Sequence, residues 1–423
     1  MRAAIGVFLV SSAAWAQAPI IEISGANFRP VPLAVAHPVA GHEGASGATL
    51  KEFDSALLFD FAACGLFQVL DRKSFLADGK EGQTASSIAF ANWANVGAEE
   101  LVKTQVTLEG EVLKADLRLF AVAAGREEMK AQANGATKDV RALAHALANA
   151  VYKHFTKETG PFETRISWVR RNGANKDVFV SDWDGKNAVQ VTNGGMNLLP
   201  GLSPDFQTVA YTSYKRGKPE IFSQRVYGTA TPVVTGGRMA TGVAFSPDAK
   251  RIAYSLADGE SAQIWVAQAD GSNARQLTNT PFFINSSPTF SPDGKRLAFV
   301  SSRSGTPQVY VMPSEGGEAT RLTFQGNYNQ TPDWSPRGDL IAFTARDERN
   351  AFDIFTVNVE TKKIVRLTQD QANNEEPSFS PNGRLVLFTS TRSGTPSLYV
   401  MTTDGNVQTA LLSDKGTYST PDW

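Results

Sequence analysis

A recurring tetrapeptide in the second half of the chain constrains the fold more than any other feature. It begins with Ser-Pro, usually ends in Gly, and its five copies start 43 to 45 residues apart. Each copy predicts a type I turn, because Ser accepts a local hydrogen bond, Pro presets φ and Gly is favoured at the fourth position. The spacing is typical of the blades of a β-propeller. The copies are Ser203-Pro204-Asp205-Phe206, Ser246-Pro247-Asp248-Ala249, Ser291-Pro292-Asp293-Gly294, Ser335-Pro336-Arg337-Gly338 and Ser380-Pro381-Asn382-Gly383.

Short strand-like segments surround each turn in a fixed order. In one repeat, an inner strand at Ala244-Phe245 precedes the turn and a second strand, Arg251 to Ser255, follows it. A third strand lies at Ile264-Trp265-Val266, and an outer strand ends near Gln276-Leu277-Thr278. These segments are rich in β-branched and aromatic residues, so we expect four strands per repeat. Phe206 and Ala249 stand where glycine is favoured, and we expect their two turns to be less regular.

The two ends of the repeat array complement each other. The first repeat begins at Arg165 to Val169 with no inner strand before it, whereas the chain ends in an inner strand with no turn after it. That last segment, Tyr418 to Trp423, resembles the inner strand Thr331-Pro332-Asp333-Trp334. Joining the ends completes six blades and leaves no open sheet edge, whereas an open solenoid would need polar capping repeats. The sequence therefore predicts a six-bladed propeller over residues 161–423, closed by the C-terminal strand.

Residues 17–160 lack the repeat and alternate between helical and strand patterns. Apolar residues recur at helical spacing in Leu50 to Ala62, and Arg141 to Phe155 predicts a second, amphipathic helix. Leu66 to Leu70 predicts a strand, whereas Ala98 to Val102 suggests a further helix. We therefore expect an α/β domain, joined to the propeller through Gly160-Pro161-Phe162.

The first 16 residues have the pattern of a signal peptide. Arg2 precedes an apolar run from Ala3 to Val10, and small residues end the segment at Ala14-Trp15-Ala16. Cleavage after Ala16 is favoured, because cleavage after Ala18 would place Pro19 directly after the cut. The run is far shorter than the roughly 20 residues that a membrane-spanning helix needs. Export permits disulfides, but Cys64 is the only cysteine, so stability has to come from packing.

Composition limits the kinds of partner. Hydrophobic residues make up 42% of the chain and charged residues 20%, as in ordinary globular proteins. The net charge is −1, with both signs interspersed, so no long-range field attracts nucleic acid or an anionic membrane. We therefore expect partners to be recognised through shape and local contacts.

No enzymatic or cofactor-binding constellation stands out. Propellers of this repeat type occur in prolyl oligopeptidase-like hydrolases, but these need a hydrolase domain with a Gly-x-Ser-x-Gly elbow that is not found here. The four histidines lie outside the propeller and lack ligand spacing. We therefore expect no catalytic residue, no metal and no cofactor.

Three weaker patterns leave alternatives open. His37 and His42 near Glu43 could bind a metal, although histidines in loops are usually solvated. Asp182-Trp183-Asp184-Gly185 resembles the start of a calcium loop, but the remaining ligands are missing and a turn is favoured. Trp183, Trp265 and Tyr310 could line a sugar site, although their position in strands favours packing between blades. An exported propeller that binds a carbohydrate or another small ligand is thus the alternative function.

A set of motifs along nearly the whole chain resembles the TolB family of the Tol-Pal system of Gram-negative bacteria. The match includes the signal peptide and the ordered segments that follow it, so it is more specific than the Ser-Pro turns alone. The segments are Ile20-Ile21-Glu22-Ile23, Pro30 to Val35, Gly65 to Arg72, Asn92-Trp93, Gly97 to Val102, Val151-Tyr152-Lys153 and Thr164-Arg165-Ile166.

The resemblance implies a monomeric periplasmic scaffold without membrane insertion. It implies binding of the Pal lipoprotein at the propeller mouth and of the TolA C-terminal domain by Gln17 to Phe28, in support of outer-membrane integrity and of its invagination during division. Within that segment Ile20, Ile21, Glu22 and Ile23 form a strand signal, which would join a partner's sheet or the edge of its own.

The resemblance also implies which loops face Pal: those that enter the inner strands. One position departs from the family pattern, because Met239 replaces a histidine. The implied contact residues are Asn197, Met239, Ala240, Asn285, Ser286, Asn329, Gln330, Asn374, Glu375, Tyr418 and Ser419.

Overall fold

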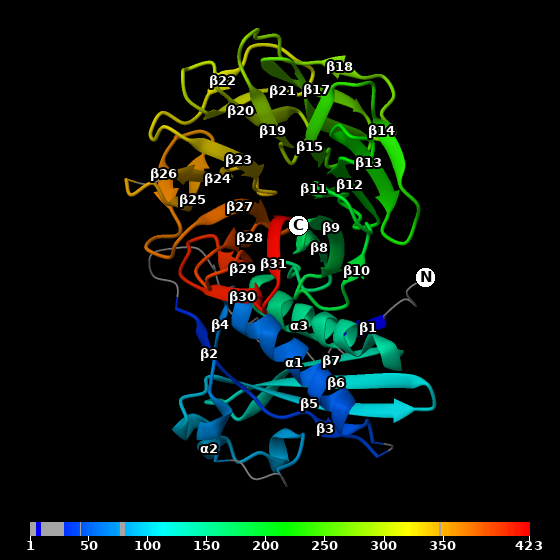
Figure 1. Ribbon diagram of the computed structural model, residues 1–423. Coiled ribbons are helices and arrows are strands. Elements are labelled where there is room, and N and C mark those ends of the chain that lie inside the picture. Colours follow the sequence, from blue (N-terminus) through cyan, green and yellow to red (C-terminus); the bar gives the residue numbers. More distant parts are fainter. Residues whose placement is uncertain (1–5, 10–28, 43, 77–80, 347) are drawn as a thin grey trace. The chain divides into compact units, whose positions relative to one another are not determined.

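Figure 1 shows the computed structural model of the chain. It describes residues 6–9, 29–42, 44–76, 81–346 and 348–423. Contacts divide the chain into two compact units, Met1–Glu163 and Thr164–Trp423. Most of the predicted signal peptide, including its cleavage site, and the segment Ile20 to Ile23 lie outside the described residues.

The first unit contains a mixed sheet. Its strands follow the order β1-β7-β6-β5-β2-β4, and β3 pairs with β5. β2 runs parallel to β4 and β5, whereas β5, β6 and β7 form an antiparallel meander. The bounds are β1 Gly6–Leu9, β2 Val31–Val35, β3 Val39–Ala40, β4 Phe67–Val69, β5 Glu100–Glu109, β6 Val112–Ala121 and β7 Arg126–Ala136.

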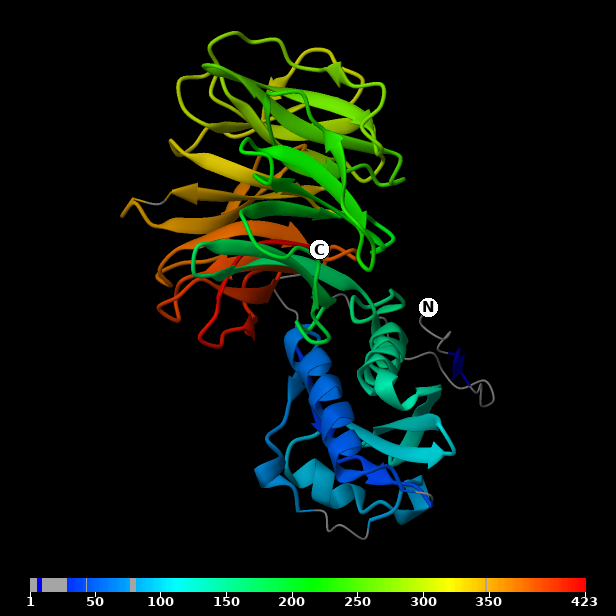
Figure 2. The same cartoon turned by 45° about the vertical axis from the view of Figure 1, so that its right-hand side comes forward.

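Two long helices pack against each other in this unit, as Figure 2 shows. They are α1, Gly47–Ala63, and α3, Val140–Thr156, and a short helix α2 spans Phe90–Asn95. The Ser46 hydroxyl accepts the Thr49 N–H and so caps α1. These helices contain the predicted segments Leu50 to Ala62 and Arg141 to Phe155. Burial raises the pKa of the Cys64 thiol to about 12, as expected for an unreactive core cysteine. Short 3-10 turns span Arg72–Ser74, Ala85–Ser87 and Thr137–Asp139.

The helix expected at Ala98 to Val102 is wrong. Glu100 begins β5, where Leu33 and Val35 of β2 pair with Glu100 and Val102. The segment was too short for its periodicity to distinguish a helix from a buried strand, and sheet pairing decides the outcome.

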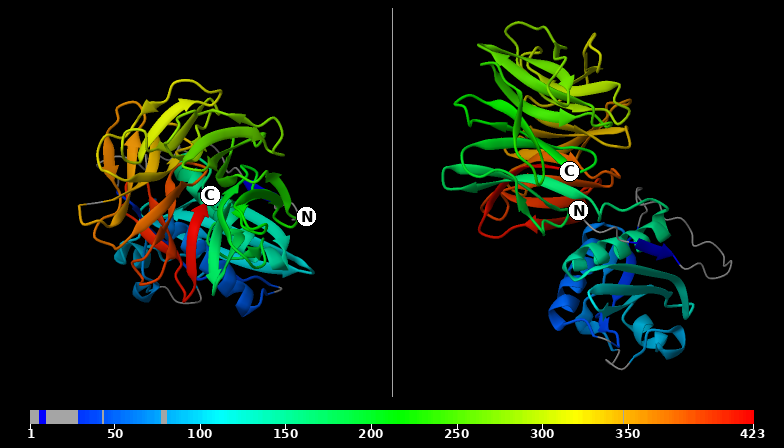
Figure 3. Two further views of the ribbon diagram at one scale, coloured as in Figure 1. Left: turned by 45° about the horizontal axis from the view of Figure 1, so that its top comes forward. Right: turned by 90° about the vertical axis from the view of Figure 1, so that its right-hand side faces the viewer.

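The second unit is a six-bladed β-propeller, which confirms the predicted fold class. The described residues form six four-stranded antiparallel sheets here, arranged in a ring in Figure 1 and shown from two further sides in Figure 3. Blade 1 holds β8 Arg165–Asn172, β9 Asn175–Asp182 and β10 Val189–Gln190, with β31 described below. Blade 2 holds β11 Asn197–Leu202, β12 Thr208–Ser213, β13 Glu220–Arg225 and β14 Thr231–Val234. Blade 3 holds β15 Met239–Phe245, β16 Arg251–Asp258, β17 Ser261–Gln268 and β18 Arg275–Gln276.

The remaining blades repeat this order. Blade 4 holds β19 Asn285–Phe290, β20 Arg296–Ser301, β21 Gln308–Pro313 and β22 Thr320–Arg321. Blade 5 holds β23 Asn329–Trp334, β24 Leu340–Arg346, β25 Phe352–Asn358 and β26 Ile364–Arg366. Blade 6 holds β27 Asn374–Phe379, β28 Leu385–Ser390, β29 Ser397–Thr402 and β30 Gln408–Leu412. The first strand of each blade in this list is the inner strand, except in blade 1.

The last strand closes the ring as the sequence predicted. β31, Thr417–Asp422, pairs antiparallel with β8 and supplies the inner strand of blade 1. The buried Tyr418 ring meets Trp168 edge to face at 5.3 Å, and Trp423 stacks on the buried Trp183 at 5.9 Å. Aromatic packing therefore adds to the backbone hydrogen bonds at the closure.

Aromatic residues pack within and between blades: Trp265 and Tyr310 lie in strands, whereas Trp183 directly follows β9. Trp183 and Tyr310 are buried, and Trp265 packs against a cluster of buried residues that includes Tyr254 and Ile252. This packing favours the structural interpretation of the three residues over a sugar site.

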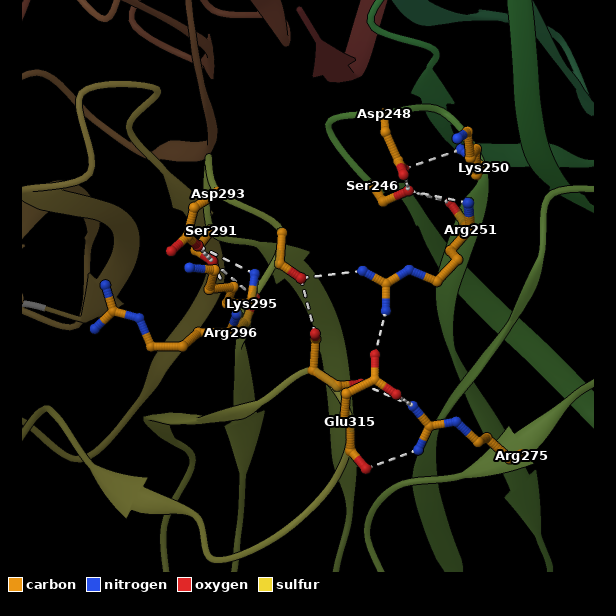
Figure 4. A network of polar contacts seen from close by, with 12 residues as sticks. Ser246, Asp248, Lys250, Arg251, Arg275, Ser291, Asp293, Lys295, Arg296 and Glu315 are labelled. Carbon is orange, nitrogen blue, oxygen red and sulfur yellow. Dashed lines mark hydrogen bonds and ion pairs between the residues drawn. The ribbon is translucent and has the colours of Figure 1, made fainter.

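The Ser-Pro turns are more uniform than their sequences suggested. Phe206 and Ala249 adopt left-handed φ values of 57° and 58°, where Gly294 has 68°. Their N–H groups still donate to the turn serines at 2.7 and 2.8 Å, so the expected irregularity is wrong. Figure 4 shows one reason: the Asp248 carboxylate accepts hydrogen bonds from the Ser246 hydroxyl and the Lys250 N–H and braces the turn.

A polar bridge beside two of these turns connects blades 3 and 4. Arg251 and Arg275 both donate to the Glu315 carboxylate, as Figure 4 shows. Arg251 also donates to the Gly294 carbonyl at 3.1 Å. Because Arg251 and Arg275 come from blade 3 and Glu315 and Gly294 from blade 4, the contacts fix the two blades to each other.

No helix among the described residues combines the length and apolar character needed to cross a membrane.

Candidate functional site

The loops that enter the inner strands meet at one end of the propeller, which we call the mouth. The six inner strands run in the same direction, so their first residues lie at the mouth and the Ser-Pro turns lie at the opposite end, the turn end. The predicted contact residues of the propeller all lie within the first three positions of an inner strand. The structure therefore brings them to one end of the channel.

Four of the predicted contact residues are buried asparagines. Asn197, Asn285, Asn329 and Asn374 occupy the first position of their strands. The Asn285 amide donates to the Ala262 carbonyl at 3.1 Å and to the Thr280 hydroxyl at 2.8 Å, while its oxygen accepts from Arg303 at 3.0 Å. These bonds fix the loop between two blades. All four asparagines are buried, so they contribute to the frame of the mouth below its surface.

The other predicted residues differ in how far they reach the surface. Ala240 and Tyr418 are buried, and the Tyr418 hydroxyl donates to Asp414 at 2.5 Å. The Met239 side chain is 43% exposed. Four further predicted residues are polar and half-buried: Ser286, Gln330, Glu375 and Ser419.

One of the four asparagines is less well satisfied than the others. Ser213 and Ser390 each donate a hydroxyl to the oxygen of their paired asparagine at 2.8 Å. Ala345 pairs with Asn329 at the equivalent position, and no donor among the described residues reaches the Asn329 oxygen. A buried carbonyl oxygen without a partner costs stability.

We therefore expect Ala345→Ser to stabilise the propeller by about 1 kcal/mol, which is the typical net value of such a hydrogen bond. In a thermal melt this corresponds to a rise in Tm of about 2 to 4 °C for a unit of this size. Ala253→Ser is the matched control, since it buries a hydroxyl in an apolar cluster and should lower Tm. A lower Tm for both variants would contradict the prediction.

Each inner strand has a bulge just inside the mouth. The pairing register shifts at the same place in all six, and one residue there adopts a left-handed φ. A cavity of about 140 Å³ lies in the channel beside these bulges. The left-handed residues are Leu199, Gly242, Ser287, Thr331, Glu376 and Thr420.

The carboxyl groups of Asp333, Glu376 and Asp422 line this cavity, and Glu375 directly precedes Glu376 in the chain. The Glu376 carboxylate accepts the Thr420 N–H at 2.6 Å and the Thr389 hydroxyl at 2.9 Å. Burial raises the pKa of Glu376, and it also raises that of Glu375, to which the charge of Glu376 contributes. Burial thus makes both glutamates resist ionisation.

Sequence reasoning missed the most exposed apolar loop at the mouth. The side chains of Phe282 and Ile284 are 80% and 54% exposed, and Phe283 between them is also exposed. Phe282 adopts a left-handed φ of 69°, which is unfavourable for a bulky residue. A run of three apolar residues directly before Asn285, after Pro281, was the available signal.

The backbone of this loop is nevertheless fixed. The Phe283 N–H donates to the Thr280 carbonyl at 3.3 Å, and the Ala262 N–H donates to the Phe283 carbonyl at 3.3 Å. The Ile284 N–H donates to the Ser302 hydroxyl at 3.0 Å. A loop held in this way presents its side chains without having to order them on binding.

Further exposed apolar side chains lie at the mouth ends of blades 2 and 3. Together with the loop of blade 4 they form a surface that we call the mouth patch. Exposed apolar groups that gather on one face are characteristic of interaction sites. The mouth patch consists of Met196, Tyr214, Met239, Phe282, Phe283 and Ile284.

Two segments were alternative metal sites in the sequence, one with His37, His42 and Glu43 and one at Asp182 to Gly185. No group of three or more His, Cys, Asp or Glu side chains among the described residues is arranged to hold a metal ion. Glu43, the third member of one predicted cluster, lies outside the described residues. At Asp182 the Gly185 N–H donates to the Asp182 carbonyl at 2.9 Å and the Asn187 amide donates to its carboxylate at 2.7 Å, as in a turn.

Comparison with known proteins identifies the family. Residues 19–128 match the TolB amino-terminal domain, and residues 152–423 match the TolB beta propeller domain. The chain belongs to the TolB family. A Tol-Pal system protein TolB of Myxococcus xanthus (strain DK1622) is 61% identical over 417 residues, covering 99% of this chain and 96% of that protein. One from Anaeromyxobacter dehalogenans (strain 2CP-1 / ATCC BAA-258) is 44% identical over 423 residues, covering 100% of this chain and 97% of that protein.

A solved structure agrees with this TolB-family fold. The crystal structure of TolB from Acinetobacter baumannii superposes with a TM-score of 0.80 and 22% sequence identity, and the superposition covers 99% of each chain. At that identity the likeness concerns the fold. The assignment to the Tol-Pal system rests on the two sequence relatives, which match this TolB-family chain along almost its whole length.

Proposed function

We propose that the protein is a periplasmic scaffold of the Tol-Pal system. In this proposal the propeller mouth binds the Pal lipoprotein and the N-terminal segment binds TolA, so that the protein helps to maintain the outer membrane and its invagination during division. The protein acts by binding and not by catalysis. The observation that carries the proposal is the 61% identity to a Tol-Pal system protein along 99% of the chain.

The composition of the mouth surface supports the proposal of a protein partner. Exposed apolar residues of the mouth patch and half-buried polar residues occur at the same end of the propeller, and binding interfaces commonly combine the two. Few residues dominate the energy of such interfaces, and aromatic side chains are frequent among them. Phe282 is the strongest candidate, because it is a large aromatic residue that is 80% exposed on a backbone held at a left-handed φ.

The N-terminal segment supplies the second binding function in this proposal. Gln17 to Phe28 lies outside the described residues, so the argument rests on its sequence. The apolar strand signal Ile20 to Ile23 suits addition to the edge of a partner's sheet, where main-chain hydrogen bonds provide affinity. We assign this segment to TolA.

A carbohydrate-binding propeller is the alternative with less support. Trp183 and Tyr310, two of the aromatic residues that would stack on a sugar, are buried in the blade cores.

A pair of variants tests the two binding functions separately. Phe282→Ala should weaken binding of the Pal homologue by about 10- to 100-fold, the loss expected for an aromatic hot spot, and leave TolA binding unchanged. Deletion of Gln17 to Phe28 should abolish binding of the TolA C-terminal domain and leave Pal binding unchanged. Titration calorimetry with each purified partner measures both effects.

Tyr227→Ala is the matched control for the first variant. Tyr227 is 74% exposed, close to the value for Phe282, but follows β13 at the turn end. Equal loss of Pal binding in both variants would contradict the assignment of the mouth. If the intact protein bound neither partner and instead retained a glycan, the scaffold proposal would fail.

A further inference from the structure

A second and larger cavity opens at the turn end of the channel. Its volume is about 400 Å³, within the usual range for small-molecule sites. The cavity is lined by one residue from the end of each inner strand and by the prolines of the Ser-Pro turns. In blades 2 to 6 this is the last residue of the strand, and in blade 1 it is the residue directly after the strand. We call it the vestibule. These six residues at the ends of the inner strands are all apolar: Leu202, Phe245, Phe290, Trp334, Phe379 and Trp423.

Two carboxyl groups lie where the vestibule meets the smaller cavity. Asp333 of blade 5 and Asp422 of blade 1 line both cavities. Asp333 accepts the Phe379 N–H at 2.7 Å and the Thr289 hydroxyl at 3.2 Å, and Asp422 accepts the Leu202 N–H at 2.6 Å. Each carboxyl thus connects its inner strand to that of the next blade.

In blade 6 a neutral side chain links neighbouring inner strands in the same way. Ser378 occupies the equivalent position in blade 6, and its hydroxyl accepts the Trp423 N–H at 3.0 Å. Blades 2 and 3 have Gly201 and Ala244 there, which have no side-chain acceptor. The connection therefore does not require a charge, and the two acids need another explanation.

The charges around these acids are unbalanced. Every ionisable side chain that lines either cavity is acidic: Asp333, Asp422 and Glu376. At the turn end, Arg251 and Arg296 stack on Phe290 and Trp334 at 5.4 and 4.8 Å from the ring centres, and no hydrogen bond joins them to either Asp among the described residues. Lys176 acts electrostatically on Glu376. A cation in the channel would therefore meet two or three carboxyl groups and no cationic lining residue.

Burial makes the charged form of both acids costly. It raises the pKa of Asp333 to about 6 and that of Asp422 to about 8, with a further contribution to Asp422 from the charge of Asp333. A bound cation would offset this cost by supplying the missing opposite charge. Strongly perturbed acids in a cavity are typical of functional sites.

We propose that the vestibule binds a primary ammonium group carried on a short aliphatic chain. The ammonium donates its three N–H bonds to the carboxyl oxygens of Asp333 and Asp422 at the narrow end, and the aliphatic chain lies in the apolar ring of Phe290, Trp334 and Phe379. Aromatic faces in this ring favour an organic cation. A bare Ca²⁺ is disfavoured, because it takes six to eight oxygen ligands.

The probe for the experiment is n-butylammonium, titrated into the full-length protein in low salt and followed by ligand-observed NMR. We expect saturable binding at one site, and no binding of butan-1-ol, which has the same chain without the charge. The double variant Asp333→Asn/Asp422→Asn keeps an acceptor for each backbone N–H and should weaken binding at least about tenfold. Asp258→Asn is the matched control, since its side chain is 71% exposed and the net charge changes in the same sense as in each single substitution.

A second measurement on the unmodified protein keeps the test valid if the double variant does not fold. Binding of the cation deprotonates Asp422, so the affinity should increase between about pH 6.5 and pH 8.5, and protons should be released on binding. Equal affinity for n-butylammonium and butan-1-ol would overturn the proposal. Unchanged binding by a folded double variant, or displacement of n-butylammonium by stoichiometric Ca²⁺, would do the same.

Discussion

Removal of residues 417–423 is expected to leave the propeller unit unfolded under conditions in which the complete chain is folded. The truncation deletes β31 and with it every backbone hydrogen bond to the inner edge of β8. It also exposes Trp168 and Trp183, whose rings pack on Tyr418 and Trp423. Loss of the packing of two large aromatic side chains alone costs about 6 to 10 kcal/mol of unfolding free energy. This is comparable to the whole stability of a typical domain.

Near-ultraviolet circular dichroism and limited proteolysis would measure this effect. We expect the truncated chain to lose its tryptophan signal and to be digested from residue 164 onward, while fragments of the first unit persist. A synthetic peptide with the sequence of residues 413–423 should restore protection, and a scrambled peptide should not. A truncated chain with an unchanged dichroism spectrum and melting curve would show that the ring is stable with five complete blades.

The second large effect concerns Asp422 and pH. The pKa of this group is about 8 in the folded chain and 3.8 in its ordinary state, so between these values the folded state binds more protons than the unfolded state. The contribution of Asp422 to stability is therefore present below about pH 4 and is lost as pH rises toward 8. Asp422→Asn removes this loss because the amide stays neutral while it can still accept the Leu202 N–H.

We expect the Asp422→Asn variant to melt at the same temperature as the natural chain near pH 4 and at a higher temperature near pH 8.5. Each pKa unit is worth about 1.4 kcal/mol, so the gain at high pH is a few kcal/mol, or about 5 to 15 °C in Tm. Asp258→Asn should change Tm little at either pH, because that side chain is exposed. A higher Tm for Asp422→Asn at pH 4 alone would contradict the direction of the shift.

The architecture of the propeller could be predicted because it is repeated in the sequence. Five Ser-Pro turns fix the length of a blade, and the likeness of Tyr418 to Trp423 to an internal inner strand fixes the closure. Each of these signals depends on residues that are close in sequence or equivalent between repeats. The four asparagines at the mouth came from the family resemblance, which implied the loops that enter the inner strands as contact loops.

The role of those asparagines could not be predicted, because it depends on contacts between blades. Asn285 is surrounded by Ala262, Thr280 and Arg303, and the repeat pattern does not reveal that these groups enclose it. The loop of Phe282 was missed because it departs from the repeat instead of following it. The vestibule likewise emerges only when Asp333 and Asp422, which are 89 positions apart, are brought to the same channel.

The pairing of β31 with β8 also determines when the propeller can be completed. Blades 2 to 6 are each continuous in sequence and can form as soon as their own strands are synthesised, whereas blade 1 waits for β31. Until then β8 presents an unpaired edge, and its partner lies about 250 residues further along the chain. The ring thus registers whether synthesis has passed β31: a chain interrupted earlier in the propeller stays open and remains accessible to proteases and chaperones.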